Sequence, residues 1–262
     1  LEEWLQTEWP DLKVFLTSVT EQWSVISISG PKARDILESS NCSINLSNDN
    51  FPFMSFKEGS LSDFPVRIFR ISFTGELSFE INTPARYGLQ LWETLIENGK
   101  QFGLTPYGTE AMHVLRAERG FIIVGQETDG SVSPFDLGMG WIVSKKKSDF
   151  IGKRSLERSS MVQENRKQLV GLLTEDPKEV IPEGAHATTS PRIINSIDIL
   201  GHVTSSYYSP NCRRSIAMAL IKGGRNLIGK DIWLPLLTGK VLKAKVVEPV
   251  FFDPNGVRKN GI

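Results

Sequence analysis

The chain has 262 residues, 40% of them hydrophobic, and its 30 Lys and Arg residues balance its 30 Asp and Glu residues. This length fits one large domain or two ordinary ones, and 14 Phe and 6 Trp residues can build a sizeable core. A formal charge of zero removes the uniform electrostatic attraction that nucleic acid or an anionic membrane would need, and no run approaches the roughly 18 to 20 apolar residues that span a bilayer. We therefore expect no nucleic-acid partner and no membrane partner.

The first predicted elements are a helix end, a strand and a short helix. The residues before Trp9 read as the end of a helix, with no signal-peptide pattern, so we expect the chain to be a fragment of a longer protein. Trp23–Ser29 alternates apolar and polar residues as a half-buried strand does, and Gly30-Pro31 then starts a helix over Lys32–Glu38. Asn41–Asn50, rich in Asn and Ser, indicates a loop.

Two further strands and two helices follow. Val66–Phe73 and Leu77–Ile81 are predicted strands joined by a short turn. Thr83-Pro84 is predicted to cap and start a helix that ends at Gly99, and a second helix is predicted over Gly108–Arg119. Because strands and helices mix without a regular βαβ alternation, the pattern favours an α+β fold over a doubly wound parallel sheet.

The composition changes after about Lys147, and the charged stretch Glu157–Lys167 is interpreted as a linker or a surface helix. Short strand-like runs separated by Gly and Pro turns follow it and predict a small antiparallel barrel or sandwich. We therefore predict two domains, residues 1–160 and 161–262. The strand-like runs are Gln168–Leu173, Gly201–Tyr207, Ile216–Ile221, Ile232–Leu236 and Val241–Val247.

Common catalytic and metal-binding motifs are missing from the sequence. It contains no P-loop, no GxGxxG after a strand, no GxSxG elbow and no HExxH. His113, His186 and His202 lie far apart and have no partner at metal-ligand spacing, so no metal site is predicted. Cys42 and Cys212 are too few for a disulfide framework and are interpreted as reduced thiols of a cytoplasmic protein.

The helix over Gly108–Arg119 carries the most informative carboxylates. Glu110 and Glu118 are spaced to share one helical face. Because Arg116 and Arg119 flank Glu118, spacing alone favours a solvated salt-bridge face. The alternative is a binding carboxylate, since a carboxylate can accept two parallel N–H bonds from a guanidine-like edge such as that of a pterin.

A run of three cations, Lys145–Lys147, follows the apolar stretch Trp141–Val143, which is predicted to be a strand. Such a run is usually only solubilising. It is also suited to a glutamate tail or a carboxylate substrate, and periodicity leaves both interpretations open.

Several blocks, in family order between about residues 20 and 252, resemble the T-protein of the glycine cleavage system. The block Ser72–Ile81 contains the TGE-x-x-FEI signature. The other blocks are Leu115–Gly120, Ser133–Trp141, Asp149–Lys153 and Gly201–Pro210.

A narrower resemblance is to the alpha subunits of heterotetrameric sarcosine oxidases. The chain also has RAERG where glycine-cleavage T-proteins usually have RLEAG. The blocks that carry this resemblance are Thr17–Trp23, Thr105–Glu110, Phe121–Gln126, Val143–Lys147, Arg166–Leu173 and Pro249–Pro254.

The resemblance implies a folate-binding α+β core, incomplete at its N-terminus, followed by a C-terminal antiparallel β-barrel. It implies an oxidoreductase in which sarcosine is oxidised at a flavin of the beta subunit and tetrahydrofolate captures the one-carbon unit as 5,10-methylenetetrahydrofolate. NAD and flavin are then expected elsewhere in the complex with the beta, gamma and delta subunits, and this chain alone is expected to be inactive in oxidation.

The resemblance also suggests individual residues. Glu118 matches the glutamate that holds the pterin ring, and Lys146 lies where a basic residue approaches the folate tail. Glu80, Trp141 and Phe251 are further candidates for the folate site. The catalytic group is unassigned, and we expect it upstream of Leu1.

Two other functions remain open. One is a stand-alone aminomethyltransferase of the glycine-cleavage or dimethylglycine dehydrogenase type. The other is a subunit-assembly module whose folate pocket is incomplete.

Overall fold

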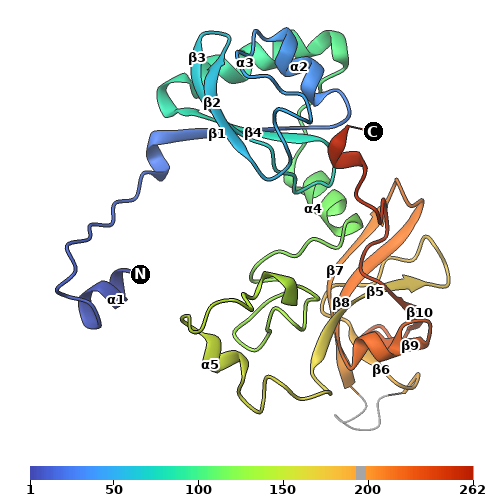
Figure 1. Cartoon of the computed structure of the whole chain (residues 1–262). Coiled ribbons are helices and arrows are strands. Elements are labelled where there is room, and N and C mark those ends of the chain that lie inside the picture. Colours follow the sequence, from blue (N-terminus) through green and yellow to red (C-terminus); the bar gives the residue numbers. More distant parts are fainter. Residues whose placement is uncertain (193–198, 262) are drawn as a thin grey trace. The chain divides into compact units, whose positions relative to one another are not determined.

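The computed structural model describes residues 1–192 and 199–261 and contains two compact units (Figure 1). The first unit holds residues 1–72, 76–106 and the chain from 258 onward, and the second holds residues 73–75 and 107–257. The domain boundary that composition places near residue 160 remains a proposal.

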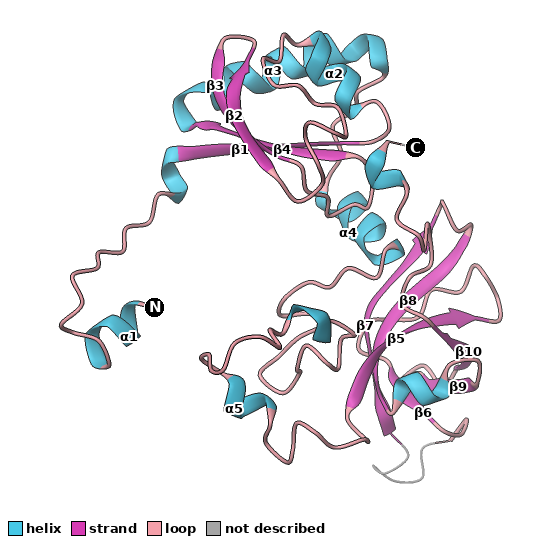
Figure 2. Cartoon of the chain, in the orientation of Figure 1, coloured by secondary structure: helices cyan, strands magenta, loops and turns pink. Residues whose placement is uncertain are grey.

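The first unit is built on a four-stranded antiparallel sheet in the order β1-β4-β3-β2 (Figure 2). Two helices cover one face, because Ile36 and Leu37 of one helix and Leu91 and Leu95 of the other share a single apolar core with the sheet. The elements are α1 (Glu2–Thr7), β1 (Trp23–Ser29), α2 (Ala33–Ser39), β2 (Phe56–Leu61), β3 (Phe64–Phe69), β4 (Ser78–Pro84) and α3 (Gly88–Gly99), with 3₁₀ turns η1 (Thr20–Gln22), η2 (Ala85–Tyr87) and η3 (Lys100–Phe102).

The alternating strand pattern predicted β1 correctly, and the short helix after it is α2. The predicted cap at Thr83-Pro84 is wrong. Thr83 pairs with Ser24 of β1 and donates its hydroxyl to the carbonyl of Pro65, so both residues belong to β4 and the helix begins at Gly88. A strand, β2, was missed because its sequence, FKEGSL, has charges and a glycine where apolar residues would signal one.

The second unit is built on a closed antiparallel barrel in the order β10-β5-β8-β7-β6-β9. This confirms the predicted barrel, and each of the five strand-like runs overlaps one strand. Among the strands of the described barrel residues, only β6, of three residues, has no counterpart in the prediction, because so short a segment shows no period. The strands are β5 (Lys167–Thr174), β6 (His186–Thr188), β7 (Ile199–Ser209), β8 (Arg214–Lys222), β9 (Asp231–Pro235) and β10 (Val241–Val247), with 3₁₀ turns η6 (Gly224–Leu227) and η7 (Arg258–Asn260), the latter in the first unit.

Before the barrel, the second unit contains α4 (Thr109–Glu118), η4 (Gly140–Ile142), α5 (Lys153–Leu156) and long loops. The predicted strand at Trp141–Val143 is wrong, since this stretch is a 3₁₀ turn followed by loop and leaves Trp141 80% exposed. Residues 157–166 form a largely exposed connection without a helix, so the surface-helix interpretation is wrong, and the segment lies inside the second unit. Throughout the described part of the chain, every helix is too short or too polar to cross a bilayer.

Candidate functional site

Glu118 ends α4 and is nearly completely buried, with 2% of its surface exposed. Its two carboxylate oxygens accept different donors: the hydroxyl of Ser209 at 2.5 Å and the side-chain amide of Asn211 at 2.8 Å. Its backbone carbonyl accepts the N–H groups of Phe251 and Phe252 at 2.9 and 3.0 Å. These bonds fasten the end of α4 to the end of β7 and to the segment that follows β10.

The interpretation of Glu118 as part of a solvated salt-bridge face is therefore wrong. Its partners are neutral, and neither Arg116 nor Arg119 pairs with it. Each carboxylate oxygen can accept about two hydrogen bonds and here accepts one, so the group retains capacity for two further donors. A buried carboxylate with free acceptor positions is chemically suited to a ligand that presents two N–H groups.

A second buried carboxylate, Glu127, pairs with a side chain of α4. Arg116 and Glu127 form an ion pair at 3.1 Å, and both side chains are 0% exposed. Arg116 also donates to Ser205 at 2.6 Å and to the carbonyl of Phe121 at 3.0 Å. Ser205 and Ser209 are four residues apart on β7, so their side chains lie on the same face of the strand. The hydroxyl of Ser205 accepts from Arg116, and the hydroxyl of Ser209 donates to Glu118.

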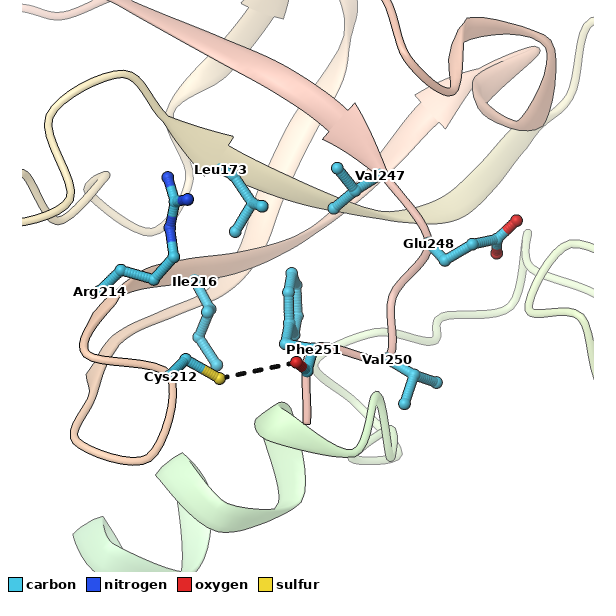
Figure 3. A pocket seen from close by; sticks show the side chains of 8 residues that line it. All are labelled: Leu173, Cys212, Arg214, Ile216, Val247, Glu248, Val250 and Phe251. Carbon is cyan, nitrogen blue, oxygen red and sulfur yellow. Dashed lines mark hydrogen bonds between the residues drawn. The ribbon is translucent and has the colours of Figure 1, made fainter. Parts of the chain in front are cut away.

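A cavity of about 210 Å³ lies at the end of β10, and Glu118 is not one of the residues that line it (Figure 3). Its wall is mostly apolar, and the ring of Phe251 stands near its centre (Figure 3). A Cβ placed on Gly171 would lie 2.8 Å from this ring, so glycine leaves room for it. The cavity is lined by Leu173, Cys212, Arg214, Ile216, Val247, Glu248, Val250 and Phe251.

Hydrogen bonds connect this cavity to Glu118. Ser209, which donates to Glu118, accepts the backbone N–H of Cys212 at 2.9 Å, and the thiol of Cys212 lies 3.7 Å from the carbonyl oxygen of Phe251. Burial raises the pKa of the Cys212 thiol, and the charge of Glu118 raises it further. This thiol therefore stays protonated at neutral pH, which suits a wall and not a nucleophile.

Arg214 supplies the positive charge of the cavity wall. One guanidinium nitrogen donates to the carbonyl of Thr174 at 2.7 Å, and its Nε is buried without a hydrogen-bond partner among the described residues. The sequence gives no sign of this role, because a lone arginine at the start of a strand carries no motif. Its position makes it the group in this wall that would meet an anionic part of a ligand.

The other sequence candidates lie outside this cavity. Lys146 is exposed, and its backbone N–H bonds to the Ser144 hydroxyl. Trp141 projects into solvent. Glu80 lies on β4 in the first unit, half-buried, and desolvation raises the pKa of its carboxyl group. Within the second unit, Glu118 and Phe251 are joined by a backbone hydrogen bond, whereas Lys146 and Trp141 are exposed and are not part of the cavity wall.

The histidines form no metal site with their neighbours. His186 faces His202 across the β6–β7 pair, and burial lowers the pKa of His202. Among residues 1–192 and 199–261, no three His, Cys, Asp or Glu side chains gather in a way that could hold a metal ion. Cys42 and Cys212 are free thiols.

Comparison with known proteins gives relatives over the whole chain. It is 49% identical to a sarcosine oxidase subunit alpha of Corynebacterium sp. (strain U-96), over all of this chain and 27% of that protein. It is 41% identical to the Rhizobium meliloti subunit, over 98% of this chain and 26% of that one. An aminomethyltransferase of Thermoanaerobacter pseudethanolicus is 30% identical, over 97% of this chain and 66% of that enzyme. The chain thus spans about a quarter of the length of the sarcosine oxidase subunits that it matches.

A solved structure and two family models agree on the fold. The aminomethyltransferase T of the glycine cleavage system from Bartonella henselae superposes with a TM-score of 0.74 at 24% identity, covering 88% of this chain and 60% of that one. Residues 1–147 match the GCVT N-terminal domain, and residues 167–253 match the glycine cleavage T-protein C-terminal barrel domain. The resemblance to T-proteins and to sarcosine oxidase alpha subunits is confirmed, and the chain belongs to the glycine cleavage T-protein family.

Proposed function

We propose that this chain is the tetrahydrofolate-binding part of a sarcosine oxidase alpha subunit, acting with beta, gamma and delta subunits. The observation that carries the proposal is Glu118, a buried carboxylate with free acceptor positions, whose backbone carbonyl accepts the N–H of Phe251 in the wall of a mostly apolar cavity. The high identity to sarcosine oxidase alpha subunits supports the choice of parent enzyme.

In this proposal, each residue has a limited task. Glu118 accepts N–H groups of the pterin ring, Phe251 forms an apolar wall, and Lys146 meets the glutamate tail. Glu80 and Trp141 are further candidates for contact with the folate. An apolar wall that keeps water away from the ring favours transfer of the one-carbon unit. The reason is that the iminium carbon must react with an amine of the folate before it reacts with water.

The reaction that we assign to the whole complex begins with oxidation of sarcosine at a flavin of the beta subunit, where oxygen takes up the electrons as hydrogen peroxide. Tetrahydrofolate then takes the one-carbon unit from the resulting imine, which yields 5,10-methylenetetrahydrofolate and glycine. NAD, like the flavin, is assigned to other parts of the complex.

Calorimetric titration of the chain with tetrahydrofolate tests the proposal. Glu118→Gln should weaken binding by about 1.5 to 3 kcal/mol, the scale of hydrogen bonds to a charged group. The matched control is Glu110→Gln, because Glu110 lies on the same helix and is exposed; it should leave the affinity unchanged. Equal affinities of the Glu118 variant and the unchanged chain would contradict the assignment of Glu118.

One observation favours a second candidate, a subunit-assembly module with an incomplete folate pocket. The cavity of about 210 Å³ is smaller than the roughly 300 to 1,000 Å³ of typical ligand sites, and Lys146 and Trp141 lie outside its wall. If titration of the unchanged chain gives no heat of binding, this candidate replaces the first. A stand-alone aminomethyltransferase is the third candidate, and transfer activity in the absence of other subunits would establish it.

A further inference from the structure

Glu118 lies in the last turn of α4, where the helix dipole favours a cation over an anion. The two arginines near it in sequence are paired with other carboxylates, Arg116 with Glu127 at 3.1 Å and Arg119 with Asp253 at 3.6 Å. The helix and its cations therefore do little to hold this buried carboxylate in place. Neutral donors from elsewhere in the second unit have to do so.

Both donors come from the turn that joins β7 to β8. Ser209, the last residue of β7, donates its hydroxyl to one oxygen of Glu118 at 2.5 Å, and the side-chain amide of Asn211 donates to the other at 2.8 Å. The Ser209 oxygen also accepts the backbone N–H of Cys212 at 2.9 Å. A serine hydroxyl has a single proton to donate, and Cys212 supplies its own, so the proton of Ser209 is directed at Glu118.

The backbone of this turn is restricted, so it presents the Asn211 side chain from a defined place. Ser209 and Arg214 pair across the two strands and close the turn. Within it, the ring of Pro210 fixes the φ angle of the residue before Asn211, and Arg213 adopts the left-handed region with a φ of 54°. The amide of Asn211 thus approaches Glu118 from a turn with little conformational freedom.

Two donors on different oxygens fix the plane of a carboxylate, which otherwise rotates broadly about its terminal bond. Each oxygen of Glu118 then keeps one acceptor position in a defined direction. A ligand that carries a ring N–H beside an amino group can fill both positions with parallel hydrogen bonds. A ligand without the amino group leaves one buried acceptor unpaired, which lowers its affinity.

We propose that Asn211 is a positioning residue which, together with Ser209, makes Glu118 selective for ligands with a 2-amino-4-oxopyrimidine edge. This inference rests on the function proposed above for Glu118. Asn211 acts through the carboxylate and is not assigned a contact with the ring. Without its amide, one carboxylate oxygen loses its fixed donor, the group can turn, and the amino group of the ligand contributes less to binding.

The test compares calorimetric affinities for tetrahydrofolate and for an analogue in which a methyl group replaces the 2-amino group. The unchanged chain should prefer tetrahydrofolate by about tenfold or more. Asn211→Ala removes the donor, and Asn211→Asp replaces it with an oxygen of the same shape; each should lower this ratio by about threefold or more. The control is Asn226→Ala in η6, because the Asn226 side chain makes no hydrogen bond within the described part of the chain, and the ratio should not change.

The ratio of the two affinities separates positioning from general damage, because a variant that only loosens the fold weakens both ligands alike. If Glu118→Gln loses the preference while both Asn211 variants keep it, this inference is overturned and the proposed function stands. A control variant that loses the preference also overturns it. If the unchanged chain binds neither ligand, or if Glu118→Gln keeps the preference, the role proposed for Glu118 fails and this inference fails with it.

Discussion

Two ionic side chains near the end of α4 are both buried but are compensated in different ways. Arg116 meets an opposite charge, Glu127, whereas Glu118 meets only the neutral donors Ser209 and Asn211. A buried ion pair already compensates both of its members, whereas a buried carboxylate held by two neutral donors keeps acceptor positions that a ligand can use. This difference is the residue-scale reason for placing the candidate site at Glu118 and its support at Arg116.

The structural role of Arg116 leads to a stability prediction. Arg116→Met should lower the free energy of unfolding by about 3 to 5 kcal/mol, because it leaves the carboxylate of Glu127 buried and unpaired. Lys100→Met is the control, since Lys100 and Glu97 form a pair that is mostly exposed, and it should cost about 0 to 1 kcal/mol. Urea unfolding followed by fluorescence measures both variants. Similar losses in the two would show that the buried pair is not a major support.

The sequence predicts a role for Glu118 but neither its hydrogen-bond partners nor the buried Glu127. Spacing put Glu118 on a helical face and the family resemblance gave it a role, but neither showed that its partners would be Ser209 and Asn211, more than ninety residues away. Glu127 was missed altogether, because it lies in a polar turn, GQETDG, that reads as solvated loop. A local pattern cannot report a partner that only the tertiary fold supplies.

At the scale of elements, the close contact between β7 and β8 depends on a glycine. A Cβ placed on Gly201 would lie 1.8 Å from the carbonyl oxygen of Leu220, a backbone atom that cannot move without opening the pair. Gly201→Ala should therefore destabilise the second unit by about 1 to 3 kcal/mol or more.

The control for this prediction is Gly130→Ala. A Cβ at Gly130 would have no atom within 4 Å, and its φ is not positive, so the substitution should be nearly neutral. Urea unfolding compares the two variants under one set of conditions. If Gly201→Ala unfolds at the same urea concentration as Gly130→Ala, the two strands do not need the close approach that the structure shows.

The prediction of helices and strands succeeded where one face of a segment is buried. It failed where pairing with neighbouring strands determines the secondary structure of the segment. Trp23–Ser29 alternates because one side of β1 packs on the core, so its pattern was sufficient. Thr83-Pro84 looked like a helix start but completes β4, because pairing with β1 outweighs a local capping signal. Trp141–Val143 is apolar yet forms a turn, since no neighbouring strand pairs with it within the described chain.

At the scale of the whole molecule, the two family models divide the chain at another place than its two compact units, because the main part of the second unit begins at residue 107 and so includes the end of the first family match. The first family model ends at residue 147 and the second begins at 167, on either side of the exposed connection that composition had suggested as a linker. The barrel buries its own apolar core, and the first unit's sheet and helices bury another. Each unit therefore has the core that an independently folding domain requires.

By itself, this chain is not expected to oxidise sarcosine. Oxidation of sarcosine removes a hydride equivalent, which none of the ordinary side chains can accept, so the step needs a redox cofactor. We assign that cofactor to the beta subunit, and we therefore expect the purified chain to release no hydrogen peroxide from sarcosine, with or without tetrahydrofolate. Addition of the beta subunit and its remaining partners should restore peroxide release. The measurement is a peroxide assay on preparations that are checked for flavin absorbance. If a flavin-free preparation of the chain alone releases peroxide from sarcosine, the oxidation takes place on this polypeptide.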